Sequence, residues 1–211
     1  IWTRPQNEVE QEEYNEFYKH ISHDWEVPLK TLRFKIEGTF EAQVLLFLPT
    51  KAPYDLFHRE FQRGIQLYVK RVFIMDDCDS LVPQYMRFVR GVVDSEDLTL
   101  NISREILQQD RQIQAIRKRL IKKVLTTLED LRDQEPEVYE PFWLEFGKAL
   151  KEGIYEDQNN QETLLSLGLF HSTHDEQKLT SLRDYVSRMK PEQDKIYYIT
   201  GESLDTLRQS P

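Results

Sequence analysis

The feature that most limits the possible folds is a long apolar stripe between residues 111 and 128. Its apolar side chains recur every three or four residues, which is the spacing of one face of an α-helix. They are Ile113, Ile116, Leu120, Ile121, Val124, Leu125 and Leu128. No acidic residue occurs from Arg111 to Lys123, and six basic residues lie in this range. The sequence therefore predicts an amphipathic helix with a basic face, and such a face is more often solvated than functional.

The start of this helix carries an unusual charge. Asn101 or Ser103 is a suitable N-cap, because a short polar side chain accepts the unpaired amides of a first turn. Arg104 then falls at or near the first turn, where the helix dipole disfavours a cation. Arg104 either pairs with a neighbouring carboxylate such as Glu105 or Glu96, which is the commoner case, or meets an anion such as a phosphate. The residues alone leave both possibilities open.

Charge and composition exclude several classes of protein. The 28 basic and 37 acidic residues give a net charge of -9, so we expect no binding to nucleic acid. No apolar run approaches the roughly 18 residues of a membrane span, and Ile1 opens directly into polar sequence rather than a signal peptide. We therefore expect no membrane association. A single cysteine, Cys78, excludes an internal disulfide and suits a reducing, cytoplasmic compartment. The missing initiator methionine suggests a piece of a longer chain.

Strands and helices alternate along the rest of the chain. Before the stripe we expect a helix over 8–21, an antiparallel hairpin over 32–36 and 40–48, a strand over 65–75, a short helix over 83–88 and a strand over 91–93. After it we expect helices over 142–150, 162–169 and 181–189, a strand over 195–200 and a helix over 202–207. This pattern predicts an α/β fold. Its parts are a large α/β/α subdomain over 1–133 that carries the arginine loop, a helical connector over 134–168 and a small α/β/α subdomain over 169–211.

No local motif completes an active site. The seven glycines form neither a P-loop nor a dinucleotide-binding turn, so a self-contained nucleotide site is not expected. No nucleophile elbow of the Gly-x-Ser-x-Gly type occurs. Cys78 has no activating base in the sequence around it, and we expect an inert thiol.

Metal ligands are present only in incomplete sets. The pairs His20-x-x-His23 and His171-x-x-His174 would each place two imidazoles one turn apart on a helix, but neither pair has a third ligand nearby. The acidic residues of 76–79 lack the glycine and the closing glutamate of a calcium loop. We therefore expect no metal site.

Four apolar residues occur in irregular, proline-bounded stretches. They are Trp25, Tyr54, Leu56 and Phe57. Exposed together, they would form a patch that marks a protein-binding surface. Alternatively, they cover the end of the hairpin as part of the core, which spacing alone favours.

Seven ordered stretches carry a resemblance to a known family. They are residues 1–4 (IWTR), 13–19 (EYNEFYK), 52–57 (APYDLF), 67–74 (LYVKRVFI), 87–108 with DSEDL at its centre, 184–189 (DYVSRM) and 195–199 (KIYYI). In order and content they resemble the middle domain of the ninety-kilodalton heat-shock chaperone family. The resemblance covers essentially the whole chain. It departs from the family pattern at Thr99, where proline is usual.

The resemblance implies a role in ATP hydrolysis. Members of the family are homodimeric chaperones with an N-terminal domain that binds ATP with Mg²⁺, this middle domain and a C-terminal dimerisation domain. It implies that Arg104, assisted by Gln108 and Asn101, reaches the γ-phosphate held by the N-terminal domain. That would explain a cation at a helix start. The chain alone is then expected to hold no cofactor and not to hydrolyse ATP.

The resemblance also implies protein partners. Non-native client proteins would be contacted through the aromatic residues Trp25, Tyr54, Leu56 and Phe57. Co-chaperones would be further partners, and the sequence assigns no site to them. We expect the chain itself to be monomeric, because the family's dimer contact lies elsewhere. The alternative is an interaction module without a catalytic share, whose basic helix and aromatic residues bind a partner. A metal-dependent hydrolase is a third class, and it would require zinc in the purified chain.

Overall fold

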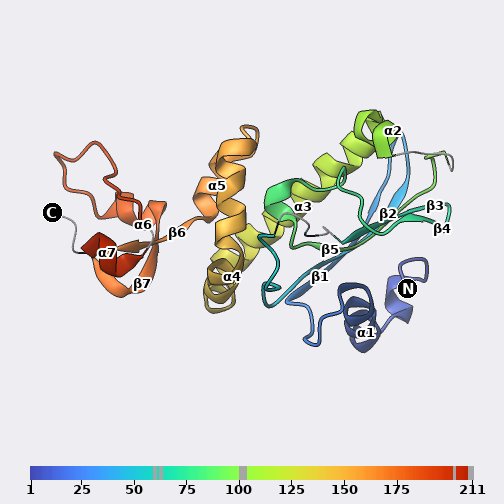
Figure 1. Ribbon diagram of the computed structural model, residues 1–211, viewed down its shortest axis with the longest axis horizontal. Helices are drawn as coiled ribbons and strands as arrows, with labels where there is room; N and C mark the ends of the chain where they lie inside the picture. Colours follow the sequence, from blue (N-terminus) through green and yellow to red (C-terminus); the bar gives the residue numbers. More distant parts are fainter. Residues whose placement is uncertain (59–60, 62–63, 100–103, 202, 209–211) are drawn as a thin grey trace. The chain divides into compact units, whose positions relative to one another are not determined.

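The strands that precede the long helix form one five-stranded sheet (Figure 1). They are β1 (Lys30–Ile36), β2 (Ala42–Leu48), β3 (Ile65–Val69), β4 (Val72–Met75) and β5 (Arg90–Ser95). In the order β1-β2-β5-β3-β4, neighbours are antiparallel except β3 and β5, which are parallel. The side chains of 44–48 in β2 are fully buried, as expected for a continuous apolar run with both faces covered.

Helices cover both faces of this sheet in the computed structural model (Figure 1). On one face, α1 (Gln11–Ser22) packs Tyr14 and Tyr18 against Leu45 and Phe47. On the other lies α3 (Arg111–Gln134), whose seven predicted stripe residues are all buried. The other helical elements before residue 168 are η1 (Gln6–Glu8), η2 (Gln84–Met86), α2 (Arg104–Gln109), α4 (Pro136–Glu156) and α5 (Gln161–Leu167). The predicted α/β fold class is confirmed.

The chain divides into two units, Ile1–Leu167 (unit 1) and Gly168–Pro211 (unit 2). The structure describes residues 1–58, 61, 64–99, 104–201 and 203–208, with the backbone alone at 104–106. The predicted division into three parts remains a prediction; α4 and α5 fall within unit 1. Among the described residues, no helix has the length and apolar character that crossing a bilayer requires.

The single strand predicted over 65–75 is wrong, because the chain turns back within it. β3 and β4 form a hairpin around Lys70 and Arg71, both with positive φ (51° and 66°). This turn contains none of the glycine or asparagine that signals such a conformation, so the sequence hides it. The turn is held by β5: the Lys70 N–H donates to the Ser95 carbonyl at 2.9 Å, and the Arg71 N–H donates to Asp94 Oδ1 at 3.1 Å.

Unit 2 differs from its prediction in two places. A hairpin of β6 (Leu169–Ser172) and β7 (Asp175–Ser181) precedes α6 (Leu182–Ser187), and α7 (Leu204–Arg208) follows. The hairpin takes the end of the predicted 162–169 helix. It places His171 in β6 and His174 in the turn that follows, rather than both on a helix. The strand predicted over 195–200 is not formed. Strand-forming residues there have no ladder partner among the residues described, and the Tyr197 N–H instead meets the Tyr185 hydroxyl at 3.4 Å.

Candidate functional site

The predicted site residues lie at two opposite ends of the five-stranded sheet (Figure 1). The loops that carry Trp25 and Tyr54 precede β1 and follow β2, and because these strands are antiparallel both loops lie at the same end. β5 pairs with the start of β2, so the chain leading to Arg104 leaves the opposite end. We call these the aromatic end (residues 23–29 and 49–58) and the arginine end (residues 96–99 and 104–117). A seven-residue strand such as β1 spans roughly 20 Å, so no small ligand could touch both.

At the arginine end, Arg104 is the first residue of α2. Arg104 therefore lies in a first helical turn, as predicted, but the turn belongs to α2 and not to the long helix. The side chain of Arg104 and all of Asn101 and Ser103 lie outside the described residues. The choice between a carboxylate partner and an anionic ligand for Arg104 therefore remains a prediction, as does the assisting role of Asn101.

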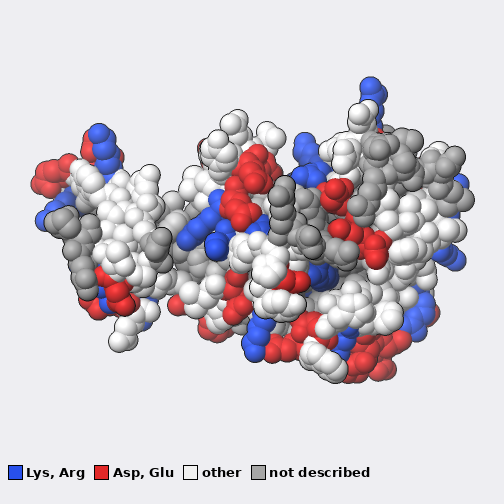
Figure 2. Space-filling model, viewed as in Figure 1, with Lys and Arg blue, Asp and Glu red and all other residues white. Residues whose placement is uncertain are grey.

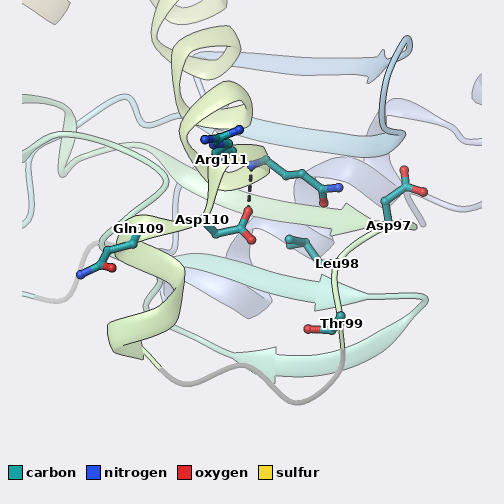
Figure 3. A pocket seen from close by; sticks show the side chains of 7 residues that line it. Asp97, Leu98, Thr99, Gln109, Asp110 and Arg111 are labelled. Carbon is teal, nitrogen blue, oxygen red and sulfur yellow. Dashed lines mark hydrogen bonds between the residues drawn. The ribbon is translucent and has the colours of Figure 1, made fainter.

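The long helix does not start where its cap was predicted. Asp110 separates α2 from α3 and is the N-cap of α3, its Oδ1 accepting the N–H groups of Gln112 at 2.8 Å and Ile113 at 3.0 Å (Figure 3). Its own N–H donates to the Leu107 carbonyl at 3.3 Å. Leu107 is buried. α2 and α3 thus meet at an elbow that the apolar pattern did not reveal, because a single capping residue interrupts it.

A hollow of about 510 Å³ lies beside this elbow. Its lining comes from the strand that leaves β5 and from the elbow itself: Asp97, Leu98, Thr99, Gln109, Asp110, Arg111 and Gln112. In Figure 3 the segment of Leu98 and Thr99 faces Asp110 across it. Asp97 is fixed at its edge, where Oδ2 accepts the Glu41 N–H at 2.6 Å. The chain is therefore anchored on both sides of the arginine loop.

Gln108 lies at a second, smaller hollow of about 250 Å³ together with Gln114, Arg117 and the turn at 79–80. The Gln114 side-chain amide donates to the Gln108 carbonyl at 2.9 Å. Arg117 Nη1 donates to the Ser80 carbonyl at 3.2 Å. The side chain of Gln108 is exposed, so it is accessible to a ligand. Its role in assisting Arg104 remains a prediction.

The basic face of α3 is solvent-exposed as predicted. Its exposed members are Arg111, Lys118, Arg119, Lys122 and Lys123, and none of them forms an ion pair with a described carboxylate. Acidic side chains gather instead over α1, through Glu12, Glu13 and Glu16 (Figure 2). The two helices give unit 1 surfaces of opposite charge.

At the aromatic end, Trp25 and Tyr54 are almost fully exposed, at 93% and 92%. Phe57 is 43% exposed, whereas Leu56 is 1% exposed. The core alternative therefore applies to Leu56, which has no surface to offer a partner, and the inclusion of Leu56 in an exposed patch is corrected here. Exposed apolar side chains mark a binding surface when they lie together, whereas single ones are common, and Tyr155 is 90% exposed as well. The binding role of Trp25, Tyr54 and Phe57 remains a prediction.

The two aromatic loops are linked to each other by polar contacts. Thr50 Oγ1 donates to the Val27 carbonyl at 2.8 Å, and Lys51 Nζ pairs with Glu26 at 2.8 Å. Asp24 braces the loop of Trp25: its carboxylate accepts the Tyr18 hydroxyl at 2.8 Å and the Glu26 N–H at 3.1 Å. Burial, and then this hydrogen bond to Asp24, raise the pKa of Tyr18.

Arg87 braces the loop of Tyr54 from inside. Its side chain is 3% exposed and forms a bidentate pair with Glu152 of α4, at 2.6 and 2.9 Å. Arg87 Nε also donates to the Leu56 carbonyl at 2.8 Å, and its guanidinium lies 4.8 Å from the ring centre of Phe57. Lys148 lies over the same ring at 4.5 Å. Sequence reasoning missed Asp24 and Arg87, because no local sequence pattern marks a charged residue whose hydrogen bonds hold a neighbouring loop in place.

The other candidates show no reactive arrangement. Among the residues that the structure describes, no cluster of three or more His, Cys, Asp or Glu side chains is placed to hold a metal ion. Burial raises the pKa of the Cys78 thiol to about 11. The thiol is therefore protonated at neutral pH, in agreement with the inert cysteine expected.

Comparison with known proteins gives one consistent result. The Hsp90 protein family model matches residues 1–211. The chaperone protein HtpG of Rhodococcus jostii is 59% identical over 211 residues, and that of Nocardia farcinica is 60% identical over 212. Each comparison covers 100% of this chain and 33% and 32% of the relative, so the chain spans about a third of their length.

A solved structure matches over the same range. The middle domain of a heat shock protein of Plasmodium falciparum is 34% identical, with a TM-score of 0.85 over 100% of this chain and 81% of that one. The fold is therefore that of a heat-shock chaperone middle domain. The chain belongs to the Hsp90 protein family, and its relatives in Rhodococcus jostii and Nocardia farcinica are HtpG chaperones.

Proposed function

We propose that this chain completes the ATPase site of a longer Hsp90-type chaperone. In this proposal an N-terminal domain of the same protein binds ATP with Mg²⁺, a C-terminal domain forms the homodimer, and the middle domain supplies Arg104. The observation that carries the proposal is the place of Arg104. It opens a short helix at an end of the sheet, where the helix dipole disfavours a cation unless an anion is present.

The residues of this chain fit a contribution to an ATPase site that another domain supplies, rather than a complete nucleotide-binding site. The sequence contains no phosphate-binding glycine loop. Arg104 would neutralise charge that develops on the transferred phosphoryl group, as arginine fingers do. Gln108, exposed one turn further along α2, and Asn101 would assist. When bound, the nucleotide would supply the phosphoryl chemistry, and this chain would supply positive charge and orientation.

The aromatic end supports a second part of the proposal, binding of non-native clients. Trp25 and Tyr54 present large apolar surfaces to solvent on loops that Asp24, Arg87 and the Glu26–Lys51 pair hold in place. An ordered aromatic surface binds exposed apolar segments at little entropic cost. Phe57 extends this surface at its edge.

The decisive experiment is steady-state ATP turnover of the full-length protein with Arg104→Ala, measured beside ATP affinity. Arginine fingers contribute roughly 10³–10⁵-fold to rate in other NTPases, so we expect turnover to collapse while ATP binding persists. Arg183→Ala, which removes an exposed arginine from α6, is the control and should retain turnover. Unchanged turnover in Arg104→Ala would refute the split-site proposal.

The alternative function is an interaction module with no catalytic share. The exposed basic face of α3 favours it, since Lys118, Arg119 and Lys122 form no ion pair with a described carboxylate. Under this alternative Arg104→Ala would leave turnover unchanged, and charge reversal on α3 would weaken binding of an acidic partner instead. The same turnover measurement separates the two.

A further inference from the structure

The direction of α2 cannot come from the helix itself. It has six residues, and a helix of this length is not stable alone in water. Its backbone nevertheless sets the point from which the side chain of Arg104 starts. The contacts that hold α2 must therefore come from the surrounding fold.

Three contacts of the described residues hold the C-terminal end of α2. Leu107 is 1% exposed and anchors one face in the core. The Asp110 N–H donates to the Leu107 carbonyl at 3.3 Å. The Gln114 side-chain amide reaches back from α3 and donates to the Gln108 carbonyl at 2.9 Å. The last carbonyls of a helix have no intrahelical partner, so Gln114 satisfies a group that α2 leaves open.

Gln114 lies on a stable helix from which its side chain can hold α2 in place. It lies one turn into α3, and the start of that 24-residue helix is capped by the Asp110 carboxylate. Its side chain is exposed beside the hollow that also contains Gln108 and Arg117. It therefore contributes little to the core, and its contact with α2 can be removed without creating a cavity.

We propose that Gln114 is a positioning residue for Arg104, holding α2 against α3 so that the arginine is directed toward the phosphate. This inference rests on the proposed function. Without the amide donor, α2 loses one of the described contacts at its C-terminal end, and fewer molecules present Arg104 correctly. The rate of the chemical step then falls, whereas nucleotide affinity, supplied by another domain, does not.

The test uses Gln114→Glu in the full-length protein. Glutamate has nearly the same shape and helix propensity as glutamine, and a negative charge near a helix N-terminus is favourable, so α3 stays intact. Only the N–H donor is lost. A single hydrogen bond of this kind corresponds to a roughly two- to tenfold change in population. We expect kcat to fall by that factor, with KM for ATP and the unfolding midpoint unchanged.

Two variants test the cause of the fall. Gln114→Lys replaces the lost donor by an ammonium group, and we expect it to restore most of kcat. Thr126→Glu places an added negative charge at an exposed position of α3, twelve residues beyond Gln114, and we expect wild-type turnover. If Thr126→Glu slows turnover as much as Gln114→Glu, the fall is an effect of added charge and the positioning role is refuted.

The link to Arg104 is tested by combining the changes. If Gln114 acts through Arg104, Gln114→Glu has no further effect on the residual turnover of Arg104→Ala. An equal additional loss in that background would refute the inference. Wild-type kcat in Gln114→Glu, beside a collapse in Arg104→Ala, would refute this inference alone. Full turnover in Arg104→Ala would refute the proposed function and this inference with it.

Discussion

The two ends of the sheet are built on different principles. At the aromatic end, charged side chains hold two loops in place. Asp24 holds the loop of Trp25, and Arg87, paired with Glu152, holds the loop of Tyr54. At the arginine end, the described contacts that hold α2 include one buried leucine, the bond from the Asp110 N–H to the Leu107 carbonyl and the side-chain amide of Gln114. The contacts at the aromatic end fix a surface, whereas the described contacts at the arginine end support the C-terminal end of one short helix.

This difference matches what each end is proposed to do. An aromatic surface that meets many clients gains affinity when it is ordered beforehand, because less entropy is lost on binding. An arginine that acts on a nucleotide held by another domain has to approach that domain. The described contacts of α2 lie at its C-terminal end, and Arg104 is its first residue, at the opposite end. The predictions below test this contrast.

The largest effect on stability is expected at Arg87. Replacing it by alanine leaves the carbonyl of Leu56 without its donor and removes the pair with Glu152, whose side chain is 34% exposed and is rehydrated. Loss of hydrogen bonds that involve a charged group costs about 1.5–3 kcal/mol. Urea unfolding of Arg87→Ala against wild type measures this loss. Lys19→Ala, which breaks the exposed Lys19–Glu16 pair, should lower stability by less than about 0.5 kcal/mol. A loss below about 1 kcal/mol in Arg87→Ala would show that the aromatic end is not held by this side chain.

The cap between α2 and α3 should have a smaller effect. Asp110→Ala leaves the N–H groups of Gln112 and Ile113 without their acceptor, and loss of an N-cap costs roughly 0.5–2 kcal/mol. Asp110→Asn retains a side-chain oxygen and should recover most of that stability. Unfolding in urea compares the three proteins. Equal stability of Asp110→Ala and wild type would show that the elbow contributes nothing to α3.

The bracing of Trp25 predicts a pH-dependent difference. Tyr18→Phe removes the hydrogen bond to Asp24 and should lower stability at pH 8 by about 1 kcal/mol. Burial and the Asp24 bond raise the pKa of Tyr18 in the folded state. The stabilisation is therefore present below the unfolded tyrosine pKa of about 10 and is lost as pH rises above it. The two unfolding curves should converge between pH 8 and pH 11, and a constant gap would contradict this assignment.

The sequence predicted elements wherever apolar periodicity was long. The stripe of α3 and the buried run of β2 were predicted because many side chains repeat one spacing. Local features of one or two residues, such as a helix cap or a tight turn, were not predicted. Asp110 is one polar residue in a helical pattern, and the Lys70–Arg71 turn adopts positive φ without glycine because Asp94 and Ser95 of β5 hold it.

The candidate sites show the same limit. Arg104 was found because its charge conflicts with a local helix dipole, which is a property of neighbouring residues. The backbone at Leu56 is held by Arg87, which pairs in turn with Glu152 of α4, and these residues are about 30 and 95 positions distant from Leu56 along the chain. Spacing alone grouped these residues together, and only tertiary contacts separate them.

Substitution of the exposed aromatic residues should change the free energy of unfolding least of all, and should clearly weaken the binding of an unfolded client. Trp25→Ser and Tyr54→Ser remove side chains that are 93% and 92% exposed, so each should change unfolding free energy by less than about 0.5 kcal/mol. If these rings form the client surface, affinity for a fluorescent, unfolded model client should fall in each variant and further in the double variant. Val72→Ser, an exposed apolar residue of β4, is the matched control. Equal affinity in the double variant and wild type would locate client binding elsewhere. A large loss of stability would instead show that Trp25 and Tyr54 help to build the aromatic end rather than being presented by it.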